Sequence, residues 1–292
     1  MEVIREPARM RERSRAARAA GATIGFVPTM GYLHAGHMSL VARARSECKL
    51  AVASIFVNPA QFGPGEDFDR YPRDPERDFA MLKDARVDVV FHPDAADLFP
   101  RGVAAHRAWV AVVGLSDTLC GDPGRRGPGH FRGVATVVTK LLNIVEPDVA
   151  YFGQKDAQQA IVIATLAREL DMSARIEVCP TVREADGLAM SSRNKYLTAA
   201  QRAAAPVIHR ALMAAAADAS RGQCLASALV ARAREVLRTE PEFEIEYVEI
   251  AGLSDLRSPE DGVVRGEALL AVAGRMGNTR LIDNMIVAVK AA

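Results

Sequence analysis

The sequence predicts an α/β protein whose parallel sheet has helices on both faces, with a smaller α+β domain at the C-terminal end. Over residues 1–180, short runs of apolar residues, typical of strands buried on both faces, alternate with segments of helical periodicity. Such alternation implies right-handed crossovers between parallel strands. Beyond Leu197, alanine-rich helices precede three β-rich runs. We therefore expect domains at 1–180 and 181–292, the second closing over a site on the first, with a hinge near Ser191.

The first domain should contain strands and helices in regular succession. The expected strands are residues 24–27, 50–57, 87–91, 109–113, 148–152 and 175–178. The expected helices are an amphipathic one at 5–18, then 35–48, 76–83, 134–145 and 160–170. Pro75 should start the third of these helices, whereas Pro28 and Gly31 should break the first strand.

Two long connections interrupt this pattern. Residues 60–73 and 114–133 are too rich in glycine and proline for regular structure, and long connections in compact domains are often functional. We expect the second connection to be a mobile, lid-like loop. In the second domain, helices are expected at 199–217 and 226–237, and strands near 244–250, 268–273 and 281–289.

Composition and charge exclude several classes of protein. The 292 residues include 37 basic and 36 acidic side chains, a formal net charge of +1, so no strong global field indicates a nucleic-acid or membrane partner. No apolar run approaches the roughly 20 residues that span a bilayer. The arginine-rich start lacks the apolar core of a signal peptide, and its acidic residues favour a helix over a transit peptide.

The cysteines indicate a reducing compartment. Cys48, Cys120, Cys179 and Cys224 are widely scattered and form no C-x-x-C pair, which argues against a zinc site, a redox motif or a disulfide framework. We therefore expect reduced thiols and a cytoplasmic protein.

Two histidines lie where the first strand passes into a helix. His34 and His37 flank Gly36 at this position, which in a parallel sheet faces bound ligands. The amides and the dipole of a helix start favour an anion such as phosphate, and two imidazoles add hydrogen-bond donors. The alternative is that both are ordinary surface or capping histidines, since the short pattern is weak by itself.

A second strand end repeats this arrangement. Residues 148–152 lead into Gly153, Lys155 and Asp156 before the next helix. A lysine at a helix start opposes the dipole, so a bound phosphate explains it better than local stability does. The pair could also be a solvated ion pair.

A loop after the last strand of the first domain carries two hydroxyls and a guanidinium. Ser191, Ser192 and Arg193 fit a clamp on leaving phosphates, although they could simply turn the loop. Gln61 and Gln159 suit a small substrate with a hydroxyl and a carboxylate, although each alone could be a solvated glutamine.

Several other polar residues have simpler interpretations. Arg132 could be a helix residue without a ligand, and Tyr71 should be a packing residue of its loop. The acidic residues of the same region resemble a metal cluster but are interpreted as solvated charge: Asp67, Asp69, Asp74 and Asp78. No Walker loop, dinucleotide fingerprint or Ser-His-Asp set is present.

Together these features indicate a site for nucleotide phosphates. Such a site can activate a carboxylate, a poor electrophile, by transferring AMP onto it and expelling pyrophosphate. Charge builds on the phosphates in the transition state, so positioned cations and donors should dominate catalysis.

Five motifs, in this order, resemble the pantothenate synthetase family of AMP-forming ligases. They are PTMGYLHAGH (28–37), FVNPAQF (56–62), HFRGV (130–134), FGQKDAQQ (152–159) and GLAMSSRN (187–194). The resemblance covers nearly the whole chain, whereas the H-x-G-H element alone is shared with many nucleotidylyl transferases.

The resemblance implies a homodimer with a Rossmann-like first domain and a two-step reaction. Pantoate and Mg-ATP give pantoyl adenylate and pyrophosphate, and the β-alanine amine then releases pantothenate and AMP.

The resemblance also implies roles for particular residues. An ATP site is implied at Met30, Gly31, Tyr32, Leu33, His34, Ala35, Gly36, His37, Gly153, Gln154, Lys155, Asp156, Val182, Met190, Ser191, Ser192 and Arg193. Catalytic roles are implied for His34, His37, Lys155, Ser191, Ser192 and Arg193. Pantoate is implied at Gln61 and Gln159, and β-alanine at Gln61. No protein residue is assigned to Mg²⁺, and the general acid and base stay open.

Departures from the family pattern are few. Gln154 stands where glutamate is common, Ala157 stands where an aromatic residue is common, and the segment before Gly129 is unusually rich in glycine and arginine.

Two other classes of protein stand as alternatives. One rival is a nucleotidyl transferase that joins ATP to a phosphorylated acceptor. The other is an RNA-binding protein that uses the arginine-rich start, against which the near-neutral charge and missing aromatic stacking motifs count.

Overall fold

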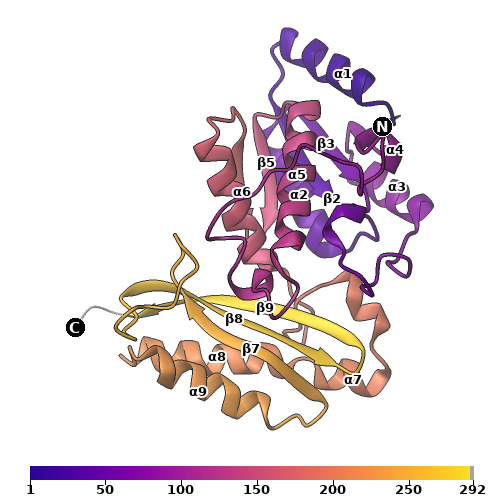
Figure 1. Cartoon of the computed structure of the whole chain (residues 1–292). Helices are drawn as coiled ribbons and strands as arrows, with labels where there is room; N and C mark the ends of the chain where they lie inside the picture. The colour runs from indigo at the N-terminus through magenta and orange to yellow at the C-terminus, as the bar shows by residue number, and fades with distance from the viewer. Residues whose placement is uncertain (290–292) are drawn as a thin grey trace. The chain divides into compact units, whose positions relative to one another are not determined.

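The computed structural model of the chain describes residues 1–289 and divides the protein into two compact units (Figure 1). The first unit comprises residues 1–117, 121–153 and 162–180. The second comprises residues 118–120, residues 154–161 and the chain from Thr181 onward. Two short segments of the N-terminal 180 residues therefore pack with the C-terminal part of the chain.

The first unit contains a six-stranded parallel sheet with the order β1-β4-β3-β2-β5-β6. Its strands are β1 (Glu2–Ile4), β2 (Ile24–Thr29), β3 (Leu50–Ile55), β4 (Val89–Phe91), β5 (Val149–Gly153) and β6 (Arg175–Cys179). The predicted α/β fold class is confirmed, although the three-residue β1 was not predicted. The largely apolar character of β2, β3 and β4 reflects burial on both faces of the sheet.

Helices cover both faces of this sheet. They are α1 (Pro7–Ala19), α2 (Ala35–Glu47), α3 (Pro75–Asp84), α4 (Ala95–Leu98), α5 (Pro128–Val145) and α6 (Ala157–Glu169). Side chains of α2 and α3 share one apolar cluster with β2, β3 and β4, whereas α1 packs on α5. Gly25 lets α2 approach β2 closely, because an added Cβ would lie 3.0 Å from the Cys48 sulfur.

The chain leaves β2 and β5 in opposite directions across the sheet. β2 and β5 are neighbours, but β2 leads through α2 to β3 on one side, and β5 leads through α6 to β6 on the other. Ligands of open parallel sheets bind at such a switch point, outside the carboxyl ends of the strands. The turn that carries His34 and His37 (residues 30–37, the histidine turn) follows β2 directly, and Gly153 ends β5.

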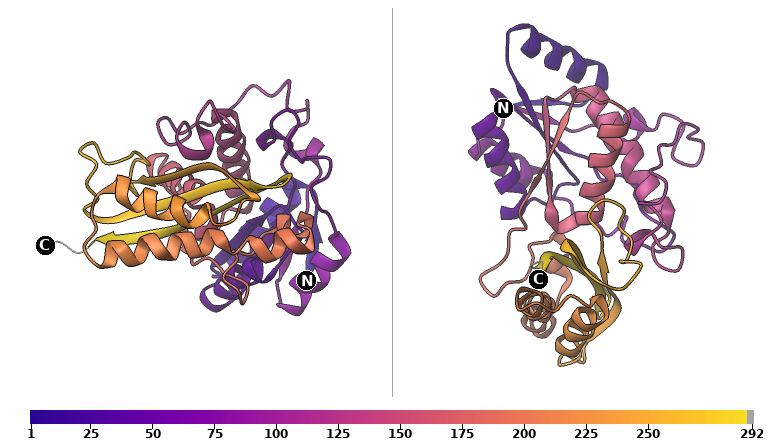
Figure 2. Two further views of the ribbon diagram at one scale, coloured as in Figure 1. Left: turned by 90° about the horizontal axis from the view of Figure 1, so that it is seen from below. Right: turned by 90° about the vertical axis from the view of Figure 1, so that its left-hand side faces the viewer.

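The second unit contains the antiparallel sheet β7-β8-β9 with two long helices on one face (Figures 1 and 2). Its elements are α7 (Ala199–Ala204), α8 (Val207–Ser220), α9 (Ala226–Leu237), β7 (Phe243–Ala251), β8 (Gly266–Met276) and β9 (Thr279–Val289). Alanine and leucine side chains of α8 and α9 pack on alternate residues of the strands to form one core. The predicted α+β character of this part is confirmed.

Four details of the sequence-based prediction are wrong. Pro28 lies inside β2, where it needs no N–H donor because β5 pairs with β2 only at Gly25 and Phe26. Residues 109–113 form no strand. Helix α5 begins at Pro128, so part of the expected loop at 114–133 is helical. The single helix expected at 199–217 is two helices, because Pro206 cannot continue α7.

Within residues 1–289, four short 3₁₀ helices connect these elements: Pro59–Gln61, Leu119–Gly121, Gln154–Asp156 and Ser192–Tyr196. The first lies against α5 at Gly133, whose added Cβ would lie only 2.0 Å from the carbonyl oxygen of Ala60. Gly133 is therefore required by packing between a loop and a helix.

Gly133→Ala should lower the free energy of unfolding by about 1–3 kcal/mol, because overpacking forces backbone shifts. Gly129→Ala is the matched control, since Gly129 lies in the same helix and has no atom within 4 Å of an added Cβ. We expect thermal unfolding to show a clear drop in Tm for Gly133→Ala and none for the control. Equal Tm values in the two variants would contradict the tight packing.

Candidate functional site

The turn between β2 and α2 has a backbone conformation that requires glycine. Gly31 has a φ of 79° and Tyr32 a φ of 50°, both in the left-handed region. An added Cβ on Gly31 would lie 3.0 Å from both Asp78 Oδ2 and Ile55 Cγ2. Gly31 N–H donates to Thr29 Oγ1 at 3.1 Å, which closes the turn from inside.

Asp78 of α3 holds this turn. Its two carboxylate oxygens accept hydrogen bonds from Tyr32 N–H and Leu33 N–H, each at 2.7 Å. The residue is only 1% exposed. Burial raises the pKa of Asp78 from its ordinary value, while the two backbone donors oppose that shift. The expectation of a solvated charge is thus wrong for Asp78, although its spacing of four from the buried Leu82 indicates the inner face of α3.

The two histidines cap helix α2. His34 Nδ1 accepts a hydrogen bond from Gly36 N–H at 3.2 Å, and His37 Nδ1 accepts one from His34 N–H at 3.3 Å. A ring nitrogen that accepts a hydrogen bond carries no proton, so each neutral ring has its proton on Nε2. The capping alternative is therefore compatible with a ligand role, because capping makes Nε2 of each histidine a donor.

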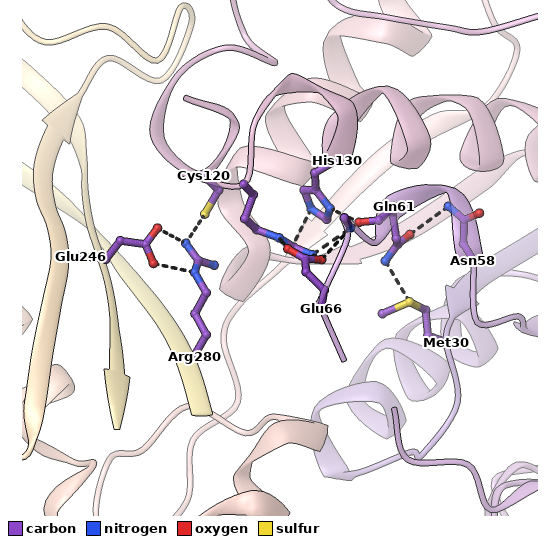
Figure 3. A network of polar contacts seen from close by, with 10 residues as sticks. Met30, Asn58, Gln61, Glu66, Cys120, His130, Glu246 and Arg280 are labelled. Carbon is purple, nitrogen blue, oxygen red and sulfur yellow. Dashed lines mark hydrogen bonds and ion pairs between the residues drawn. The ribbon is translucent and has the colours of Figure 1, made fainter. Parts of the chain in front are cut away.

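Gln61 lies at the end of the 3₁₀ helix that follows β3, and its side chain is held from two sides (Figure 3). Asn58 Nδ2 donates to Gln61 Oε1 at 3.1 Å and to the Gly133 carbonyl at 3.1 Å. Gln61 Nε2 lies 2.9 Å from the sulfur of Met30. The structure therefore brings two of the predicted site residues, Gln61 and Met30, into contact.

A charged network holds the main chain of Gln61. His130 Nδ1 lies 2.8 Å from the Gln61 carbonyl oxygen, and Arg126 contacts the same oxygen at 3.4 Å. Arg126 also forms a two-point ion pair with Glu66, at 2.8 and 2.5 Å. Burial alone would raise the pKa of Glu66, but Arg126 outweighs it and lowers that pKa. This pairing joins the two long connections beside Gln61.

Three other side chains considered from the sequence, those of Tyr71, Arg132 and Asp74, have structural partners. Tyr71 is buried, with its ring 5.9 Å from that of Phe62, as predicted for a packing residue. The Arg132 guanidinium lies 4.8 Å from the centre of the Trp109 ring, within the range of a cation–π contact. Asp74 caps α3 by accepting a hydrogen bond from Arg77 N–H.

The second unit contains the turn with Lys155. Residues Gln154–Asp156 form a 3₁₀ helix immediately before α6, and Lys155 Nζ lies 3.6 Å from Asp156 Oδ1. Asn284 of β9 donates to the carbonyl oxygens of Gln154 and Lys155, each at 2.9 Å. Gln159 lies partly buried in the first turn of α6.

The serine loop also lies in the second unit. Met190 N–H donates to the Val182 carbonyl at 3.0 Å, so these two predicted site residues are adjacent. Ser191 Oγ accepts a hydrogen bond from Arg193 N–H at 3.2 Å and caps the 3₁₀ helix Ser192–Tyr196. Ser192 is buried, whereas Ser191 and Arg193 are partly exposed.

A third polar group joins β7 and β9 to the segment 118–120 of the second unit (Figure 3). Arg280 forms a two-point ion pair with Glu246, at 2.7 and 2.8 Å, and its Nη2 lies 3.3 Å from the sulfur of Cys120. Cys120 lies 3.1 Å from the Tyr247 hydroxyl. These contacts fix a segment that sequence reasoning treated as part of a loop.

Two kinds of feature are absent from the described part of the chain. Residues 1–289 contain no group of three or more His, Cys, Asp or Glu side chains arranged to hold a metal ion. Among the same residues, no helix has the length and apolar character needed to cross a membrane. The four cysteines are free, and Cys224 is the least buried of them.

Sequence reasoning missed the residues that hold the turns. Asp78, His130 and Asn284 were given no role, although each contacts the backbone of a predicted site residue. A signal for Asn284 was present, because Asp283 and Asn284 are two polar residues in the middle of an apolar strand. Their partners could not be predicted, since they lie far away in the sequence.

The fold and the histidine turn together define a Rossmann-like α/β protein with a histidine-capped helix start beside the switch point of its sheet. The family model described as pantoate-beta-alanine ligase matches residues 2–286, and the chain belongs to this family.

Curated and solved relatives agree with this assignment. A pantothenate synthetase from Herpetosiphon aurantiacus is 52% identical over 275 residues, which cover 94% of this chain and 97% of the relative. The crystal structure of pantothenate synthetase from Thermus thermophilus matches with a TM-score of 0.88 and 45% identity, covering 98% of this chain and 99% of that one. Pantoate-beta-alanine ligase from Francisella tularensis, complexed with beta-gamma ATP and beta-alanine, matches with a TM-score of 0.78 and 32% identity, covering 98% of this chain and 97% of that one.

Asp78→Asn should loosen the histidine turn. An amide side chain can accept from one of the two N–H groups but presents its own donor to the other, so one charge-assisted hydrogen bond of about 1.5–3 kcal/mol is lost. We expect the Tyr32 and Leu33 amides to exchange hydrogen about 10–100 times faster. Asp74→Asn is the control, since asparagine caps a helix as well as aspartate does. Unchanged exchange at both amides in Asp78→Asn would show that the carboxylate does not hold the turn.

Proposed function

We infer that the chain catalyses the ATP-dependent condensation of (R)-pantoate with β-alanine, which forms pantothenate, AMP and pyrophosphate through a pantoyl adenylate. This is a step of pantothenate and coenzyme A biosynthesis. The observation that carries the inference is the family match over residues 2–286, with relatives named pantothenate synthetase at about half identity. The related Francisella tularensis ligase, whose structure is a complex with beta-gamma ATP and beta-alanine, supports ATP and β-alanine as substrates.

The chemistry has two steps. A pantoate carboxylate oxygen attacks the α-phosphorus of ATP, and pyrophosphate leaves. The β-alanine amine then attacks the carbonyl carbon of the mixed anhydride, and AMP leaves. The first step places extra charge on the phosphates in the transition state, so fixed donors and cations accelerate it more than they tighten substrate binding.

We propose that residues of the histidine turn contact ATP, with His34 and His37 on its phosphates. The residues concerned are Met30, Gly31, Tyr32, Leu33, His34, Ala35, Gly36 and His37. Two features support the proposal: Nδ1 of each histidine accepts a backbone hydrogen bond, which makes Nε2 a donor, and the turn opens helix α2.

A second set of residues, of which all but Gly153 belong to the second unit, is proposed as the other part of the ATP site. Gly153, which ends β5 in the first unit, and Asp156 would face the ribose, Lys155 the phosphates and Val182 the adenine. Gln154, Met190, Ser191, Ser192 and Arg193 complete the proposed set, with the last four over the phosphates. Lys155 opposes the dipole of α6, and this arrangement is favourable once an anion is bound.

Gln61 and Gln159 are proposed to hold pantoate, and Gln61 also to meet β-alanine. The fixed orientation of the Gln61 amide between Asn58 and Met30 supports a positioning role for it. Mg²⁺ is proposed as the metal that accompanies the ATP phosphates, and no protein residue is assigned to it.

The remaining proposals concern organisation and location. We propose that residues 181–292 close over a site on residues 1–180, and that the protein acts as a homodimer in the cytoplasm. The four free cysteines support a reducing compartment. Neither a nucleic acid nor a membrane is proposed as a partner.

A pyrophosphate-release assay tests the function. Purified protein with ATP and Mg²⁺ should release pyrophosphate only when pantoate is added, and should form pantothenate and AMP when β-alanine follows. A phosphate ester used as the acceptor tests the rival nucleotidyl transferase. Release with the ester and none with pantoate would replace the proposed reaction. Salt-sensitive RNA binding without thermal stabilisation by ATP would instead favour the RNA-binding alternative.

Lys155→Ala should lower the adenylation rate by roughly a hundredfold, as the loss of a donor to developing negative charge does. Single-turnover pyrophosphate release measures this rate without the second step. Lys83→Ala, at an exposed position in the last turn of α3, is the control and should retain the full rate. A loss of less than threefold for Lys155→Ala would exclude a role on the phosphates.

A further inference from the structure

Asn284 makes an unusual pair of hydrogen bonds to the turn that carries Lys155. Its Nδ2 group donates to the carbonyl oxygens of two consecutive residues, Gln154 and Lys155, each at 2.9 Å. Only the amide nitrogen can donate to two carbonyl oxygens, which fixes the orientation of the amide. One side chain of β9 thereby holds the two peptide groups on either side of the Lys155 Cα.

This arrangement is not what packing alone would select. Asn284 is 5% exposed, and its Oδ1 atom has no hydrogen-bond partner within residues 1–289. A buried polar atom without a partner costs free energy, so an apolar residue would be the simpler choice for a strand core. The two donated hydrogen bonds are the gain that offsets this cost.

The preceding residue fixes β9 on its opposite face. Asp283 accepts hydrogen bonds from both terminal nitrogens of Arg183, at 2.5 and 3.1 Å, and Arg183 also donates to the Gly187 carbonyl at 3.1 Å. Successive strand residues point to opposite faces, so Asp283 holds the 183–187 segment while Asn284 holds the 154–155 turn. Burial and the charge of Arg183 lower the pKa of His209 beside this ion pair.

We propose that Asn284 is a positioning residue of the adenylation step, which acts through Lys155. The inference rests on the proposed function, because it needs Lys155 to contact the ATP phosphates. Fixing the carbonyl groups of Gln154 and Lys155 fixes the backbone from which the Lys155 side chain projects. A displacement of about 1 Å in such a group can cost a hundredfold in rate, so a residue that contacts no substrate can still control catalysis.

The test is a double-mutant cycle of Asn284→Ala and Lys155→Ala, measured by single-turnover pyrophosphate release. Asn284→Ala alone should lower the adenylation rate by about 10–100-fold, with the KM for pantoate unchanged. In the Lys155→Ala background the same substitution should lower the remaining rate by less than threefold, because the group it positions is gone. A merely structural role would lower the rate equally in both backgrounds.

Ile286→Ala is the matched control. Ile286 lies two residues further along β9, on the same face as Asn284, and its side chain is more exposed. We expect this variant to retain the full adenylation rate. An Asn284→Ala variant as active as Ile286→Ala, or equally harmful in both backgrounds, would overturn the proposal.

Three further outcomes are distinguishable. If Asn284→Ala does not fold, as judged by circular dichroism, Asn284→Ser takes its place in the cycle because its hydroxyl keeps one donor. If the wild-type protein releases no pyrophosphate with pantoate, the proposed function fails. If the wild-type protein is active but Lys155→Ala is also fully active, the function stands and the positioning role is overturned.

Discussion

The buried carboxylate of Asp78 is the interaction on which the first part of the candidate site depends. It accepts hydrogen bonds from two backbone N–H groups in a turn where Gly31 and Tyr32 both have positive φ angles, a conformation that the chain does not adopt without support. Because the turn is fixed, His34 and His37 cap α2 in one orientation. The orientation of the caps in turn leaves the proton of each neutral ring on Nε2. A single acidic side chain of α3 thus determines the donors that the histidine turn presents.

The other predicted site segments are held according to the same principle. Gln61 is fixed by Asn58 and His130, the Lys155 turn by Asn284, and the 183–187 segment by Asp283 through Arg183. Each supporting group is a polar side chain whose partner is the main chain or side chain of a site segment. Adenylation depends on charge placed before the reaction begins, so this support suits the chemistry. The hydrogen bonds to the site segments also offset the free-energy cost of burying polar groups such as Asp78 and Asn284.

Much of the fold could be predicted from local patterns. Hydrophobic periodicity and turn residues predict the order of strands and helices and the change beyond Leu197 to alanine-rich helices followed by strands. They also predict the strand ends that carry the histidines and Lys155. Errors arose where a tertiary contact overrides the local signal. Pro28 continues β2 because its missing N–H faces β5, which does not pair with β2 at that position. Asp78 is buried because its carboxylate accepts hydrogen bonds from two backbone N–H groups. Residues 109–113 have a strand-like composition but form no strand.

The sequence by itself determined the fold class and the family, because strand and helix periods are local and five motifs in one order are highly specific. It also indicated that His34, Lys155 and Ser191 belong to one site for nucleotide phosphates. Only the tertiary structure decided which residues support them. Asp78 lies 45 residues along the chain from its partner Leu33, and Asn284 lies 129 residues from Lys155. Hydrogen bonds between groups so distant in sequence leave no local pattern, since they form only once the sheets and helices have packed.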